Sequence, residues 1–235
     1  MRDLIGRDDI DAAYRIQFRN IVANVKAGRT VVGRKIGLTS RAVQQELGVT
    51  MPDFGFLLDN VAVSGDGVVD SRQLLQPRIE PEIALILAAD ISEPVSMQQA
   101  VALVSEVRAS FEILDSRIAG WDISLADTIA DNASFGSYVL GDSTHPTNAP
   151  ELGAIAVTMK EDGERVPNGQ ASDAFDSVWE ALTWLANTSL EHGSPLRAGD
   201  IILTGSLGPV IDVKPGSTYT ASISGIGYVT ATFTI

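Results

Sequence analysis

Cysteine is absent from this sequence of 235 residues, and histidine occurs only twice, at His145 and His192. The first absence excludes disulfide bonds, thiolate nucleophiles, iron–sulfur clusters and cysteine-ligated zinc. The scarcity of histidine leaves oxygen atoms as the main candidate metal ligands. Long apolar runs are also missing: none approaches the ~18 residues of a membrane span, and the start of the chain has no apolar signal core. We therefore predict a cytoplasmic protein with no membrane partner.

Positive charge is also scarce. The chain has 17 Lys and Arg residues against 30 Asp and Glu residues, a formal net charge of -13. Such a field repels phosphate backbones, so we predict that the protein does not bind nucleic acid. The field would also repel an anionic substrate. A site for a small anion must therefore supply positive charge locally, from a Lys, an Arg or a bound cation.

The pattern of apolar residues predicts one folded domain of the α+β class. Strands at both ends of the chain, with helices between them and no repeating strand–helix alternation, favour a mixed or mostly-β roll over a doubly wound sheet. We predict a single catalytic domain, 1–235, in which a helical segment, 1–28, packs on a β-roll core, 29–235. The expected helices cover 10–27, 40–48, 97–109 and 178–190, the expected strands cover 30–38, 79–88, 110–116, 201–204, 210–213, 218–224 and 227–234, and 51–59 is expected to be a loop.

Carboxylates gather on two apolar segments. Glu80 and Glu82 open the apolar strand and, being two apart, project to the same face. Two carboxylates that close raise each other's pKa unless a cation lies between them. Glu112 and Asp115 lie in a second segment too apolar for a surface strand, where acids need a partner. An all-oxygen site fits Mg²⁺ or Mn²⁺. The alternatives are a solvated strand end for the Glu-x-Glu pair and, for the acids of the second segment, an internal salt bridge to Arg78 or Arg117.

Three further segments offer polar groups. Lys35 has Gly33 and Gly37 on its own face of the expected strand, which leaves open volume beside its ammonium. Such a lysine can carry protons, although an exposed strand lysine is the plainer interpretation. The glycine-containing stretch 204–208 can turn N–H groups and hydroxyls toward an anion or form an ordinary turn. The polar cluster 131–134 can line a pocket or cap a helix.

Taken together, the motifs resemble those of the 2-keto-4-pentenoate hydratases, which belong to the fumarylacetoacetate hydrolase superfamily. The resemblance runs in order from about residue 10 to the C-terminus. It is carried by GRKIGLTS at 33–40, PDFGF at 52–56, IEPEI at 79–83, EILDSRI at 112–118 and DTIADNAS at 127–134.

The resemblance implies a fold, a cofactor and site residues. The fold is a mixed β-sandwich roll of the fumarylacetoacetate hydrolase C-terminal type with a few flanking helices. Mg²⁺ or Mn²⁺ is held by Glu80, Glu82 and Glu112, and Lys35 with Asp53 forms the proton-transfer pair. Family members often form homo-oligomers, so we expect one here. We place the substrate contacts at Gly37, Leu38, Ser134, Thr204, Gly205 and Ser206.

The activity that the resemblance implies is hydration of a 2-hydroxy-2,4-dienoate to a 4-hydroxy-2-oxo acid in aromatic-compound catabolism. The ending Thr204–Pro209 resembles the hydratases rather than the related 4-oxalocrotonate decarboxylases, which remain an alternative. An acylpyruvate C–C hydrolase and a non-catalytic keto-acid-binding homologue are the others. A complex with a decarboxylase or aldolase of the same pathway is a further expectation.

Two departures from the family pattern bear on this prediction. The N-terminus is about two dozen residues shorter than the usual family start, so a peripheral helix is expected to be missing. The stretch 169–178 lacks the Gly-x-Gly and Leu-Gly-Asn/His-Pro pattern of the hydratases. Because that stretch is expected near the far end of the substrate, the sequence leaves the substituent at C5 open.

Overall fold

The computed structural model describes residues 1–235 apart from 40–43, 46–48, 50, 64, 147–154 and 168–177. The predicted helix 40–48 and the unusual stretch 169–178 therefore lie largely outside the described residues. The helices are α1 (Arg2–Ile5), α2 (Ile10–Lys26), α4 (Met97–Ala102), α5 (Leu125–Ala130) and α6 (Val178–Glu191). The strands are β1 (Val31–Gly37), β2 (Asp53–Leu58), β3 (Val68–Val69), β4 (Arg78–Leu87), β5 (Val104–Leu114), β6 (Phe135–Thr144), β7 (Val157–Glu161), β8 (Glu164–Arg165), β9 (Ile201–Ser206), β10 (Ile211–Asp212), β11 (Thr218–Ile223) and β12 (Gly227–Phe233).

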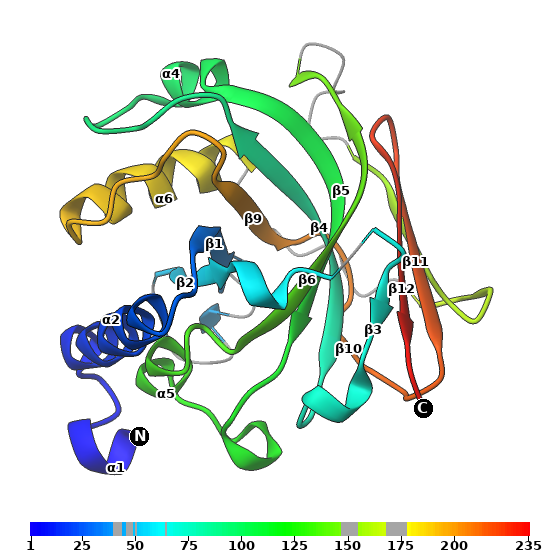
Figure 1. The fold of residues 1–235 in the computed structure, drawn as a ribbon, viewed down its shortest axis with the longest axis horizontal. Coiled ribbons are helices and arrows are strands. Elements are labelled where there is room, and N and C mark those ends of the chain that lie inside the picture. Colours follow the sequence, from blue (N-terminus) through cyan, green and yellow to red (C-terminus); the bar gives the residue numbers. More distant parts are fainter. Residues whose placement is uncertain (40–43, 46–48, 50, 64, 147–154, 168–177) are drawn as a thin grey trace.

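The strands form two mixed sheets. The larger has the order β2-β1-β9-β4-β5-β6, with β10 added to β4, and the smaller has the order β3-β12-β11-β7-β8. Strands β4 and β5 are long and strongly curved, and β11 and β12 pack beside β5 and β6 on the right of Figure 1. Helices α2, α5, α6 and α4 lie on the other side of the large sheet. The predicted α+β roll with a few flanking helices is confirmed.

Helix α2 fixes one edge of the large sheet. Its start is capped by Asp9, whose Oδ1 accepts a hydrogen bond from the N–H of Ala12. On its inner face Tyr14 stacks on Phe54 of β2, with ring centroids 4.8 Å apart. Gln17 Nε2 donates to the carbonyl oxygens of Phe54, at 2.8 Å, and Ile129, at 3.0 Å. Since Phe54 is fully buried, this packing contributes about 1.5–3 kcal/mol from its side chain alone and holds β2 in place.

Two sequence predictions about elements were wrong. The expected loop 51–59 contains strand β2, all six residues of which are buried and pair with β1. Pro52 and Gly55 suggested a turn, but the apolar side chains of β2 have α2 to pack against. The expected helix 97–109 ends at Ala102, and β5 follows from Val104 to Leu114 because pairing with both β4 and β6 outweighs local helix propensity. Strand β6 was not predicted.

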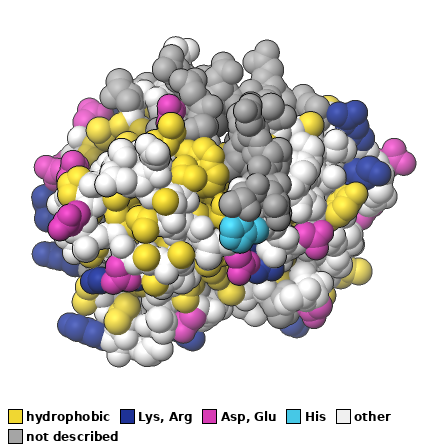
Figure 2. Space-filling model, turned by 90° about the horizontal axis from the view of Figure 1, so that it is seen from above, with side chains coloured by type: hydrophobic (Ala, Val, Ile, Leu, Met, Phe, Trp, Pro, Cys, Tyr) yellow, Lys and Arg dark blue, Asp and Glu magenta, His cyan; other side chains and the backbone are white. Residues whose placement is uncertain are grey.

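The charged side chains on the face drawn in Figure 2 are dispersed. Lys and Arg lie mainly toward its rim, and hydrophobic side chains gather next to the residues drawn in grey. Among the described side chains of this face there is no continuous basic stripe of the kind that follows a nucleic-acid backbone. None of the described helices is long and apolar enough to cross a membrane.

Candidate metal centre and active site

Three glutamates form a row on one face of the large sheet. In the antiparallel pairing of β4 with β5, Glu80 lies directly opposite Glu112 and Glu82 lies opposite Ser110. Cross-strand partners project to the same face, as do residues two apart on one strand. The three carboxylates therefore converge, and one oxygen from each lies within 4.8 Å of the others. The sequence predicted this grouping.

Curvature of the sheet brings a lysine to the same row. Strands β9 and β4 separate β1 from β5, so Lys35 and Glu112 would be about 14 Å apart across a flat sheet. Lys35 Nζ nevertheless lies 3.0 Å from Glu112 Oε1, and both side chains are buried. The salt bridges considered in the sequence are wrong for Glu112, because Arg78 pairs with Asp212 and Arg117 with Asp131.

Gly37 provides the space in which the two proposed proton-transfer groups meet. It pairs with Asp53 across β1 and β2 and lies two residues beyond Lys35, so all three residues share one face. A Cβ built at position 37 would lie 2.2 Å from Asp53 Oδ1 and 3.3 Å from Lys35 Nζ. The absence of a side chain therefore lets the ammonium and the carboxylate approach each other beside the glutamate row.

Burial and mutual repulsion set the charges of this cluster. Burial raises the pKa of Glu82 well above its ordinary value, and the charges of Glu112 and Glu80 add to the rise. Burial raises the pKa of Glu112 to about 7, against the opposing effect of Lys35. Burial also raises the pKa of Asp53. For Lys35, burial lowers the pKa, but the surrounding carboxylates outweigh it and the net pKa is raised, so the ammonium stays charged.

The cluster has the features that a small divalent cation requires. Glu82 Oε1 and Glu112 Oε2 are buried and have no hydrogen-bond partner among the described residues. Such orphaned carboxylate oxygens are costly unless a cation or proton satisfies them. Oxygen ligands at about 2.1 Å from a Mg²⁺ ion lie up to about 4.2 Å apart, so small side-chain rotations would close the three glutamates around one ion. All-oxygen ligation suits Mg²⁺ or Mn²⁺.

Gly37→Ala tests whether this space matters. The added Cβ must displace the Asp53 carboxylate, and a displacement of about 1 Å of a reacting group can cost about a hundredfold in rate. We expect kcat with the proposed hydratase substrate to fall by about that factor, measured by steady-state kinetics. Gly65→Ala is the matched control, because nothing lies within 4 Å of a Cβ there. Equal rates for both variants would contradict the assignment.

The pH dependence of stability offers a test that needs no substrate. The pKa of Glu82 and of Glu112 is higher in the folded protein than the ordinary value of 4.5, so without metal the folded state binds more protons than the unfolded state. Their stabilising contribution is complete below about pH 4.5 and is lost as the pH rises through about 7. A divalent cation replaces those protons. We therefore expect the difference in Tm between Mg²⁺ and EDTA samples to grow from pH 5 to pH 8, by thermal denaturation. A constant difference would contradict a cation held by these carboxylates.

The predicted substrate-binding residues lie in or near strand ends. Leu38 follows β1 with a φ of 56°, and its carbonyl accepts a hydrogen bond from Gln44 Nε2 at 2.7 Å. Ser134 is buried, and its hydroxyl lies 3.1 Å from that of Thr128. Thr204 donates its hydroxyl to the carbonyl of Ile83. These contacts are with the protein, and the assignment to substrate remains a prediction.

Asn132 was not singled out by the sequence. Its side chain brackets Phe56 of β2, accepting from the N–H at 2.8 Å and donating to the carbonyl at 2.9 Å. Residues 132–134 have three successive positive φ values, 57°, 53° and 51°. A Cβ at Gly55 would lie 2.5 Å from the carbonyl oxygen of Asn132. The glycine inside an apolar strand was the available signal, since it marks a close backbone approach.

Asp115 has a structural role. Its carboxylate accepts hydrogen bonds from the N–H groups of Leu75 and Gln76, at 2.8 to 3.0 Å. It thereby fixes the loop that leads into β4 and the glutamate row.

Comparisons with known proteins agree with this geometry. The family described as fumarylacetoacetate (FAA) hydrolase C-terminal matches residues 20–234. The chain belongs to the fumarylacetoacetate hydrolase family. Two relatives within it are 2-keto-4-pentenoate hydratase 1 of Dechloromonas aromatica, 43% identical over 99% of this chain and 89% of that protein, and the 2-keto-4-pentenoate hydratase of Burkholderia vietnamiensis, 42% identical over 100% and 90%.

A solved structure in the family has the same architecture. The 4-oxalocrotonate decarboxylase from Pseudomonas putida G7, complexed with magnesium and adipate, superposes with a TM-score of 0.89 and 31% identity, covering 95% of this chain and 86% of that chain. The family and the fold expected from the five motifs are therefore confirmed.

Proposed function

We propose that this protein is a divalent-metal-dependent 2-keto-4-pentenoate hydratase, a hydro-lyase. The observation that carries the proposal is identity of 42–43% with hydratases over the whole chain. The buried glutamate triad with Lys35 and Asp53 beside it supplies the chemistry. The substrate is a 2-hydroxy-2,4-dienoate and the product a 4-hydroxy-2-oxo acid, as in the breakdown of aromatic compounds.

Glu80, Glu82 and Glu112 would hold Mg²⁺ or Mn²⁺. When bound, the cation supplies Lewis acidity toward the carboxylate and C2 oxygen of the substrate, and it offsets the repulsion between an anion and an acidic protein. The decarboxylase structure, which contains magnesium, supports this choice of ion. The three glutamates are buried, so water competes weakly for the site.

Lys35 and Asp53 move the protons. In ketonisation of the dienol, the proton of the C2 hydroxyl is lost and a proton is added at C5. Addition of water then places a hydroxyl at C4 and a proton at C3. Each step needs a donor and an acceptor within reach of the substrate, and the ammonium and the carboxylate that share the space at Gly37 provide the pair.

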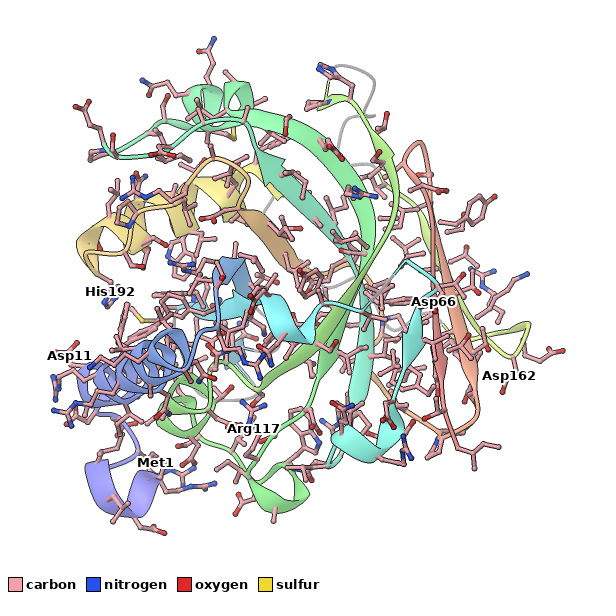
Figure 3. All side chains as sticks on the ribbon, in the orientation of Figure 1. Met1, Asp11, Asp66, Arg117, Asp162 and His192 are labelled. Carbon is pink, nitrogen blue, oxygen red and sulfur yellow. The ribbon has the colours of Figure 1, made fainter. Side chains whose placement is uncertain are left out.

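The alternatives are less well supported. The decarboxylase is 31% identical to this chain, against 42–43% for the two hydratases. A C–C hydrolase would need a water-activating histidine near a glutamate. His192 follows α6 and packs beside α2 on Tyr14, with ring centroids 4.7 Å apart (Figure 3). It contacts Phe54, which projects from the face of β2 opposite to Asp53. A non-catalytic binder would not require Lys35 and Asp53.

One incubation separates these activities. The protein is mixed with Mg²⁺ and 2-hydroxypenta-2,4-dienoate, and a second sample with 2-oxo-3-hexenedioate, while the ultraviolet absorbance of the conjugated substrate and release of CO₂ are followed. A hydratase consumes the dienoate and yields 4-hydroxy-2-oxopentanoate without CO₂. Release of CO₂ from the dicarboxylate would identify a decarboxylase, and no turnover of either would contradict the proposal.

The cellular setting follows from the same proposal. We expect one catalytic domain over residues 1–235, assembled as a homo-oligomer in the cytoplasm. A complex with a decarboxylase or aldolase of the pathway would pass the reactive dienol directly between active sites.

A further inference from the structure

Strand β9 carries one extra residue where it passes the glutamate row. In its pairing with β4, Ser206 lies opposite Glu82, but Leu203 lies opposite Ala84. Two steps along β4 are thus matched by three along β9. The extra residue is a β-bulge within Thr204–Gly205, and a bulge turns backbone groups away from the regular ladder.

The groups released by this bulge serve Glu82. The N–H of Gly205 donates to Glu82 Oε2 at 3.1 Å, and both residues are buried. The hydroxyl of Thr204 donates to the carbonyl of Ile83 at 2.9 Å, which satisfies a backbone acceptor next to the bulge. Glu82 Oε1 has no hydrogen-bond partner among the described residues. One carboxylate oxygen is therefore held by the backbone, and the other is left for the centre of the cluster.

The bulge requires glycine at its second position. Gly205 has a φ of +100°, in the region that side chains rarely adopt. A Cβ there would also lie 2.5 Å from Thr39 Oγ1 and 2.6 Å from Thr39 Cγ2. Thr39 follows β1, the neighbour of β9, so the end of one strand braces the bulge of the next.

We propose that the Thr204–Gly205 bulge is a positioning device for the metal ligand Glu82, which presets the direction of its free oxygen before a cation binds. The inference rests on the proposed metal site. It makes Thr204 and Gly205 positioning residues, whose effect on turnover passes through the affinity of the cation. Groups that orient a metal ligand in this way typically contribute about 10–100-fold to metal affinity.

Gly205→Ala and Gly199→Ala form a matched pair. Gly199 precedes β9 and also has a positive φ, +85°, but a Cβ there meets nothing within 4 Å. Both variants carry backbone strain, and only Gly205→Ala displaces the N–H that holds Glu82. We expect Gly205→Ala to bind Mn²⁺ about 10–100-fold more weakly than the wild type and Gly199→Ala to bind it equally well, by isothermal titration calorimetry without substrate.

A second pair keeps the test valid if Gly205→Ala does not fold. Thr204→Val removes the hydroxyl that satisfies Ile83, and Thr204→Ser retains it. We expect Thr204→Val to weaken Mn²⁺ binding and Thr204→Ser to restore it, with Tm in EDTA recorded for each. A lower Tm with unchanged Mn²⁺ affinity in Thr204→Val and Gly205→Ala would overturn the inference alone. Failure of the wild-type protein to bind Mn²⁺ would overturn the metal site as well.

Discussion

Glu82→Gln should abolish binding of the divalent cation and reduce hydratase activity to background. Glu82 is fully buried in the centre of the site, between Glu80 on its own strand and the bulge of β9. The amide keeps the shape of the side chain but loses the charge that a hard cation requires. We expect Mn²⁺ affinity to fall by more than the about 10–100-fold that removal of an outer-shell group costs.

The same variant should not unfold the metal-free protein. Burial and the charges of Glu112 and Glu80 raise the pKa of Glu82, so the charged carboxylate is a destabilising group until a cation binds. A neutral amide removes that repulsion. In EDTA at pH 8 we therefore expect the Tm of Glu82→Gln to equal or exceed that of the wild type, while Mg²⁺ no longer raises it.

Glu106→Gln is the matched control for this experiment. Glu106 lies on β5, as Glu112 does, but it is exposed and paired with Arg108. It should retain metal binding and activity. Full Mn²⁺ affinity in Glu82→Gln, measured beside this control, would show that the triad is not the ligand set.

The sequence predicts the components of this site better than it predicts their meeting. Glu80 and Glu82 share a face because they are two apart on a strand, and that spacing is visible in the sequence. The partnership of Glu80 with Glu112 depends on the register of β4 and β5, which a window of sequence does not contain. Half of β5 was in fact expected to be helical.

Contacts across several strands are beyond a local pattern. Lys35 reaches Glu112 only because the sheet curls across β9 and β4, strands that are far apart in the sequence. The bulge at Gly205 likewise depends on pairing with β4. The five family motifs supplied the grouping that local periodicity did not, because each motif marks a strand end that faces the same interior.

Lys35→Met should lower kcat by about 10²–10⁴-fold while the cation remains bound, which is the loss expected when a general acid–base group is removed. Methionine preserves much of the length and bulk of the side chain. Lys35 is not a metal ligand, and its ammonium pairs with a carboxylate that the cation also neutralises. We therefore expect Mn²⁺ affinity within about tenfold of the wild type, although one opposing charge has gone.

Stability separates loss of proton transfer from loss of structure. Without metal, removal of the ammonium leaves Glu112 buried with no described counter-charge, so the Tm in EDTA should fall. Because the cation supplies the missing positive charge, Mg²⁺ should raise the Tm of this variant more than that of the wild type. Lys160→Met, at an exposed position of β7, should change neither kcat nor Tm. Activity of Lys35→Met close to that of the wild type, in a protein that binds Mn²⁺, would remove Lys35 from the proton path and leave Asp53 to be tested alone by Asp53→Asn.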